Sequence, residues 1–90
     1  MTGGEIRWAF LHGVPVRYVD RVRGLDIRYP MIEEVIYRRC GGGVAVSALL
    51  ISRADSSPSS TRARSEDIFF AKEEDAERCL AELVAAEAVS

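Results

Sequence analysis

Side-chain amides and lysine are almost missing from this chain. Its 90 residues include no asparagine or glutamine, and its one lysine, Lys72, stands against eleven arginines. Asparagine and glutamine are the residues that read adenine through paired hydrogen bonds, so their absence excludes that form of base recognition. Any attraction to an anionic partner must therefore come mainly from arginine.

Histidine and cysteine are equally scarce. His12 is the only histidine, and Cys40 and Cys79 are the only cysteines. Structural zinc sites need four such ligands at short spacings, which three scattered residues do not supply. In a chain that lacks a secretory signal, two cysteines are more typical of free thiols than of a disulfide. We therefore expect no metal and no other cofactor.

Long apolar runs are absent as well. None approaches the ~20 residues of a membrane span, and the first residues lack the basic and apolar segments of a secretory signal. The composition, 48% apolar and 29% charged, is that of an ordinary globular domain. These features predict one domain over residues 1–90, located in the cytoplasm and without a membrane partner.

No catalytic arrangement can be recognised in the sequence. The glycine run 41–43 lacks the lysine and the helix of a phosphate-binding loop. Glu33 and Glu34 are adjacent, so they fall on opposite faces of a strand and make a poor acid–base pair. Cys40 is the best candidate nucleophile because it follows two arginines, but a structural thiol beside a glycine turn is the simpler interpretation. We predict that the chain is not an enzyme.

The net charge of −2 conceals two halves of opposite sign. Residues 1–64 carry ten arginines against six acidic residues, a net charge of +4, whereas residues 65–90 carry two basic against eight acidic residues, a net charge of −6. Within one small domain, we expect Glu and Asp of the C-terminal helix to face arginines of neighbouring strands. Such pairing would cancel the basic field that attracts polyanions.

Alternating apolar and polar residues predict an antiparallel sheet over residues 5–70. The alternation at Ile6–Phe10 predicts a first strand, which a turn at His12-Gly13 joins to a second strand over residues 14–22. Pro15 lacks an N–H group, so it lies at a sheet edge or precedes the strand. The further strands expected are Leu25–Tyr29, ended by Pro30, then Ile32–Arg39, Val44–Arg53 and Thr61–Ser65.

One of these strands, at residues 44–53, allows more than one interpretation, and a loop follows it. Residues 44–53 are apolar on both faces, which favours a central strand, with a helix as the competing interpretation. The β-branched Val44, Val46 and Ile51 favour the strand. Residues 55–60 consist of serines with one aspartate and one proline, and this composition predicts a mobile loop.

An amphipathic helix is predicted over residues 72–88, and Ile68–Phe70 leads into it from the sheet. Three acids follow Lys72 and suit the positive end of the helix dipole, with Ala71 as the expected N-cap. We expect the helix to bury one apolar stripe, Leu80 included, against an open sheet face or barrel end. The stripe comprises Ala76, Cys79, Leu80, Leu83 and Val84.

Arginines on the strands form the candidate binding face. Arg17 and Arg21 share one strand face, while Arg62 and Arg64 share another, and Tyr18 lies next to the first pair. Arginine beside aromatic residues on a small β-domain is typical of proteins that bind single-stranded nucleic acid, but an acidic chain lacks the expected basic footprint. Arginine and tyrosine are also enriched at protein interfaces. We therefore predict contact with a protein partner or a homo-oligomer, with binding of RNA or single-stranded DNA as the alternative.

Strands followed by EDIFF and by the acidic helix KEEDAERCLAEL form a pattern over about residues 5–86. This order resembles small uncharacterised proteins of phages and mobile elements, although Ala71 stands where those proteins carry Ser or Thr. The resemblance implies an SH3-like barrel closed by a C-terminal helix, and it assigns no functional residue. The expected fold is therefore α+β, a small antiparallel sheet or SH3-like barrel of four to five strands with one C-terminal helix.

Overall fold

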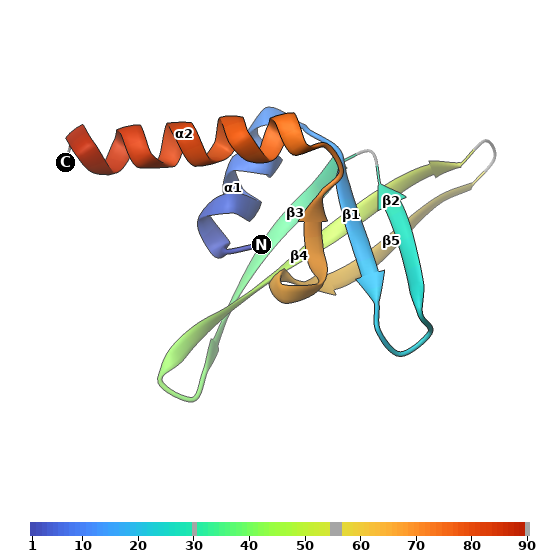
Figure 1. Cartoon of the computed structure of the whole chain (residues 1–90). Helices are drawn as coiled ribbons and strands as arrows, with labels where there is room; N and C mark the ends of the chain where they lie inside the picture. The colour runs from blue at the N-terminus through green and yellow to red at the C-terminus, as the bar shows by residue number, and fades with distance from the viewer. Residues whose placement is uncertain (30, 55–56, 90) are drawn as a thin grey trace.

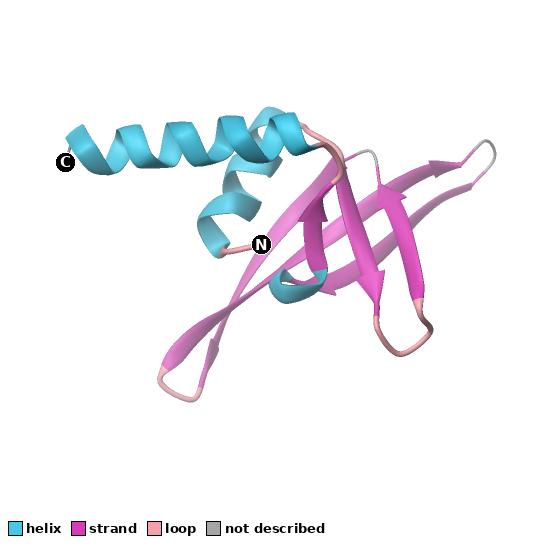
Figure 2. Ribbon diagram, in the orientation of Figure 1, coloured by secondary structure: helices cyan, strands magenta, loops and turns pink. Residues whose placement is uncertain are grey.

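The chain folds into two helices and six strands in a computed structural model that describes residues 1–29, 31–54 and 57–89. The strands form two antiparallel sheets of three strands each, ordered β2-β1-β6 and β3-β4-β5 (Figures 1 and 2). The elements are α1 (Gly3–His12), β1 (Val16–Asp20), β2 (Leu25–Tyr29), β3 (Met31–Cys40), β4 (Gly43–Ala54), β5 (Ser57–Arg64), a 3-10 turn η1 (Ser65–Asp67), β6 (Ile68–Phe70) and α2 (Glu73–Val89).

The first element is a helix, so the predicted strand at residues 6–10 is wrong. A capping box starts α1: Thr2 Oγ1 accepts a hydrogen bond from the Glu5 N–H at 3.2 Å, and Glu5 Oε1 accepts one from the Thr2 N–H at 2.9 Å. These two bonds satisfy N–H groups that a helix start otherwise leaves unpaired. Ile6 and Ala9, three residues apart, are both buried in the helix. The alternation of Ile6, Trp8 and Phe10 covers only five residues, and the capping box that precedes it favours a helix instead.

Gly13 has the positive φ that the sequence predicts, but it ends a helix instead of turning a hairpin. Its φ of 62° is left-handed, and its N–H donates to the carbonyls at the end of α1. Pro15 precedes β1, which begins at Val16, and the Pro15 carbonyl accepts a hydrogen bond from the Ala71 N–H at 3.3 Å. Ala71 is therefore not the N-cap of α2, which starts two residues later at Glu73.

The second sheet contains the longest strands. A turn at Gly41 and Gly42 joins β3 to β4, and both glycines have the positive φ that a type I′ turn requires, 53° and 95°. β4 is the central strand, as its apolar residues predict. The predicted loop at residues 55–60 is wrong for residues 57–60, which form the start of β5, while residues 55 and 56 lie outside the described part. Pairing with the long β4 outweighs their low strand propensity.

One hydrophobic core serves both sheets. Its buried side chains come from both helices, from the α1–β1 link and from strands of each sheet. They are Ile6, Trp8, Ala9, Val14, Val16, Tyr29, Ile32, Ala48, Leu50, Ala63, Ile68 and Cys79. Each sheet keeps its own edge strands, so the described ladders form two sheets and not one closed barrel. The α+β class and the C-terminal helix are confirmed, with six strands and an additional helix at the start.

The helix α2 lies on α1 and β6, and its C-terminal half extends beyond them (Figure 1). Cys79 is fully buried, and Leu83 lies next to Gly4 of α1. In contrast, Leu80 is 66% exposed and Val84 54% exposed, so the prediction that these two residues are buried is wrong. The supporting surface is one helix and one short strand instead of a broad sheet face, and it covers only a narrow stripe.

Candidate functional site

The predicted binding residues of β1 lie on opposite faces of the first sheet. Arg17 points outward, with Nε 3.3 Å from Asp26 Oδ1 and its guanidinium 5.6 Å from the centre of the Phe69 ring. Tyr18 points toward the core, where its ring meets the Tyr29 ring edge-on at 6.5 Å. Burial raises the pKa of the Tyr18 hydroxyl, and the nearby acids add to this effect. The two residues therefore do not form one binding surface.

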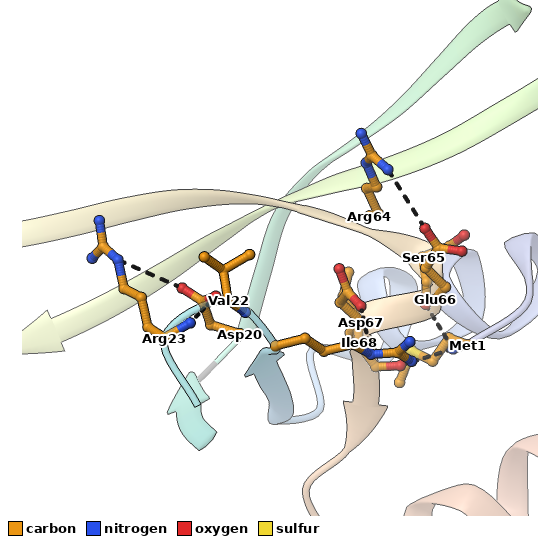
Figure 3. A network of polar contacts seen from close by, with 10 residues as sticks. Met1, Asp20, Val22, Arg23, Arg64, Ser65, Glu66, Asp67 and Ile68 are labelled. Carbon is orange, nitrogen blue, oxygen red and sulfur yellow. Dashed lines mark hydrogen bonds and ion pairs between the residues drawn. The ribbon is translucent and has the colours of Figure 1, made fainter. Parts of the chain in front are cut away.

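The arginines around the end of β1 already have acidic partners (Figure 3). Arg21 Nε lies 3.5 Å from Asp67 Oδ1. Arg23 Nε lies 3.9 Å from Asp20 Oδ2. Asp20 also accepts hydrogen bonds from the Val22 and Arg23 N–H groups at 3.0 and 3.1 Å. This end of the first sheet is locally neutral, so it offers little attraction to an anion.

The η1 turn next to it is held from the N-terminus. The Met1 amino group donates hydrogen bonds to the carbonyls of Ser65 and Ile68, each at 2.8 Å (Figure 3). Partial burial lowers the pKa of this amino group. Arg64 Nη1 lies 3.8 Å from Glu66 Oε1 in the same turn. These contacts join the start of the chain to the link between the two sheets.

Arg62 and Arg64 lie on the outer face of the second sheet, together with Arg38. The strand register places Arg62 beside Leu49, with Glu34 on the other side of Leu49, and Arg64 beside Ser47. We call the three arginines, with Ile36 and Leu49 between them, the basic face. The paired residues on this outer face include no aromatic side chain in the described part of the chain. The basic face therefore lacks the aromatic stacking groups that binding of single-stranded nucleic acid uses.

The acids in the first turns of α2 do not pair with arginines of the strands in the described part of the chain, so this prediction is wrong. Arginines of β1, of the turn after it and of β5 pair with acids from residues 20–67, none of which belongs to α2. Because Arg21 lies in that turn, the prediction that it shares a strand face with Arg17 is wrong. Within α2, Arg78 Nη1 lies 3.8 Å from Asp75 Oδ1. Among the described residues, Glu73, Glu74 and Glu77 form no ion pair. Two of the acidic partners, Glu66 and Asp67, belong to the acidic C-terminal part, so the two oppositely charged parts of the chain meet at η1 and not through α2.

A cluster around Trp8 joins the two helices. The Trp8 indole N–H donates to the Glu82 carboxylate, and the His12 ring stacks on Trp8 with ring centres 4.0 Å apart. His12 Nε2 lies 3.6 Å from Glu82 Oε2, while the Arg78 guanidinium lies 5.6 Å from the centre of the Trp8 ring. His12 therefore packs on Trp8 at the end of α1, and the contacts of Trp8 with Glu82 and Arg78 hold α2 against α1.

An open groove of about 450 Å³ lies between α1 and β3. Its large apolar side chains are exposed: Phe10 at 40%, Leu11 at 67% and Tyr37 at 57%. Charged side chains also line it. The lining residues are Arg7, Phe10, Leu11, Glu33, Glu34, Val35 and Tyr37. Exposed apolar side chains gathered in this way are typical of an interaction site.

Sequence reasoning missed this groove because it assigned Phe10 to a strand. In a helix, Arg7, Phe10 and Leu11 share one face, since they are three and four residues apart. The available signal was Thr2 followed three residues later by Glu5, which is a capping-box pattern. With α1 recognised, the exposed side of the helix could have been identified from spacing alone.

The two cysteines have different settings. Cys40 is exposed next to the β3–β4 turn, whereas Cys79 is buried and burial raises the pKa of its thiol. Among the described residues, no three His, Cys, Asp or Glu side chains are placed to hold a metal ion. Neither described helix has the length and apolar character needed to cross a membrane.

Comparison of the chain with protein-family models, curated proteins and solved structures finds no match.

Proposed function

We propose that this chain is a non-enzymatic protein-contact module whose groove between α1 and β3 receives another polypeptide. The observation that carries this proposal is the exposure of Phe10, Leu11 and Tyr37 along one groove. Contact with a protein would remove these side chains from water, which is the main favourable term in association.

A peptide display selection on the immobilised domain tests the proposal. Peptides selected on the wild-type chain should bind the Leu11→Glu variant at least about tenfold more weakly, because a charge replaces buried apolar surface. Leu80→Glu is the matched control, since Leu80 is 66% exposed, close to the 67% of Leu11, and lies on α2. Selected peptides that bind both variants equally well would show that the groove is not the binding site.

Binding of RNA or single-stranded DNA is the second candidate function, and the basic face favours it. Arg62 and Arg38 form no ion pair among the described residues, so their charges are available to phosphates. A titration at two salt concentrations tests it, since phosphate contacts make affinity fall steeply with salt. Sub-micromolar binding at physiological salt, lost in the Arg62→Ala/Arg64→Ala variant, would replace the protein-contact proposal.

We further propose that the protein is cytoplasmic and that it is related to small SH3-like proteins of phages and mobile elements. Two small antiparallel sheets around one core, with a C-terminal helix, support the kinship. Phage or mobile-element genes next to the coding sequence in several genomes are expected if the kinship is correct. Consistent placement among unrelated chromosomal genes would argue against it.

A further inference from the structure

The edge of β3 is free to accept another strand. β3 is the outermost strand of the β3-β4-β5 sheet, so every second residue directs its N–H and C=O groups away from β4. Among the described residues, no hydrogen bond from another element reaches these outward groups. Unpaired edges of this kind bind extended segments by strand addition.

The groove runs along this edge and not over one sheet face. Val35 pairs with the buried Ala48, which places Val35 and Tyr37 on the inner face, toward α1. Glu34 pairs with Leu49 on the outer face. A groove lined by side chains from both faces must follow the edge of the strand between them.

The charges along β3 mirror one another about Ile36. Residues 33–39 read Glu-Glu-Val-Ile-Tyr-Arg-Arg, with two acids before the apolar centre and two arginines after it. When two such strands pair antiparallel with Ile36 opposite Ile36, Glu34 lies opposite Arg38 of the other strand. Val35 likewise lies opposite Tyr37. Glu33 lies at the irregularity of β3 between Ile32 and Glu34, so it lies near Arg39 without facing it in regular register. The segment is therefore complementary to itself.

We propose that the partner in the groove is a second copy of this chain, paired through β3 about a twofold axis at Ile36. This inference rests on the proposed function and names its partner. Opposite charges directly across an antiparallel pair are stabilising, and the mirror pattern supplies them on both sides of the axis. The two β3-β4-β5 sheets then form one continuous six-stranded sheet with a self-complementary interface.

The apolar side chains of the groove agree with this partner. Val35 and Tyr37 of each copy point to the inner face, where α1 presents Phe10 and Leu11. Both copies keep α1 on the same side of the joined sheet, because a twofold axis perpendicular to a sheet preserves its faces. The added strand thus brings its own Val35 and Tyr37 to the Phe10 and Leu11 of the other copy.

Sedimentation over a concentration series tests the pairing. The wild-type chain should show a monomer–dimer equilibrium with a dissociation constant between about 1 µM and 1 mM. In the Arg38→Glu/Arg39→Glu variant, acids face acids across the axis, and the dissociation constant should rise about a hundredfold. The Glu33→Arg/Glu34→Arg variant should show the same loss, because arginines then face arginines.

Mixing the two variants separates this geometry from a general effect of charge. The acidic variant and the basic variant should form a heterodimer with roughly wild-type affinity, because each charged pair then again joins an acid and an arginine. Arg62→Glu/Arg64→Glu is the matched control: it makes the same charge change in the same sheet, away from the β3 edge, and should leave the dimer intact.

Three outcomes would overturn the inference. These are a wild-type chain that stays monomeric at about 1 mM, a dimer that persists in both charge variants, and a mixture that fails to associate. A monomeric wild-type chain whose groove still binds displayed peptides would disprove self-pairing while leaving the proposed function in place. Peptides that bind independently of the groove would disprove the proposed function instead.

Discussion

The two sheets of this domain differ in how their arginines are paired and in the length of their strands. In the first sheet, Arg17 pairs with Asp26, and Arg21 of the following turn pairs with Asp67 of η1. In the second sheet, Arg38 and Arg62 have no ion pair among the described residues, and the edge of β3 is open. The second sheet is also built from longer strands. The comparison teaches that the arginines around the end of β1 have acidic partners within the chain, whereas Arg38 and Arg62 of the second sheet keep their charges for contact with a partner.

The comparison assumes that both sheets share one hydrophobic core and unfold together. Leu50→Ala in the second sheet and Ile68→Ala in the first should each lower the free energy of unfolding by ~2–5 kcal/mol, because both side chains are fully buried. Leu80→Ala is the control and should change it by less than ~0.5 kcal/mol, since Leu80 is exposed. Urea unfolding measures all three. A small effect of Leu50→Ala alone would make the second sheet a separate arm.

The helix beside the open edge should depend on its cap. Thr2→Ala removes the hydroxyl that accepts from the Glu5 N–H and should lower the free energy of unfolding by ~1 kcal/mol. Thr2→Ser keeps a hydroxyl and should stay close to wild type. Both variants are compared by urea unfolding and by circular dichroism. A loss as large in Thr2→Ser as in Thr2→Ala would contradict the capping explanation.

A smaller effect is expected from the paired arginine of the first sheet. Arg17→Ala removes a partly exposed ion pair with Asp26 and should lower the free energy of unfolding by ~0–1 kcal/mol. Arg62→Ala in the second sheet should not change it measurably, because Arg62 has no ion pair among the described residues. Thermal unfolding at low and high salt measures both. Equal, salt-sensitive losses for the two variants would remove the electrostatic difference between the sheets.

The last difference concerns the cysteines and emerges only at alkaline pH. Burial raises the pKa of Cys79 above the 9.0 of a free thiol, so the folded chain holds this proton more tightly than the unfolded chain. The resulting stabilisation is complete below pH 9 and is lost as the pH rises through the pKa of the folded state. Cys79→Ala should flatten this decline in a pH series of urea unfolding, whereas Cys40→Ala should leave it unchanged. A decline as steep in Cys79→Ala as in wild type would assign it to other groups.

Several elements of the fold could be predicted from the sequence. The bounds of β2, the central position of β4 and the passage from Ile68–Phe70 into α2 all match the sequence analysis. The errors fall where a short pattern competed with a stronger local or tertiary effect. Alternation over residues 6–10 gave way to the Thr2 cap, and the composition of residues 57–60 gave way to pairing with β4.

The candidate site was less accessible to sequence reasoning. Leu80 fits an apolar stripe by spacing, but spacing does not reveal how wide the supporting surface is. The mirror pattern of residues 33–39 is visible in the sequence, but only the strand order shows that β3 is an edge. A charge pattern becomes an interface only when the fold leaves it uncovered.

The pairing of β1 with β6 also has a consequence for the order of folding. Val16 and Phe70 are neighbours in the first sheet, although the whole second sheet lies between them in the chain. Closing this distance carries a larger loop entropy than closing the two-glycine hairpin of β3 and β4, which is a local event of ~1–10 µs. The hairpin should therefore already be formed in the transition state, while the β1–β6 ladder closes late. Refolding rates should be sensitive to substitutions at Gly42, and unfolding rates to substitutions at Ile68.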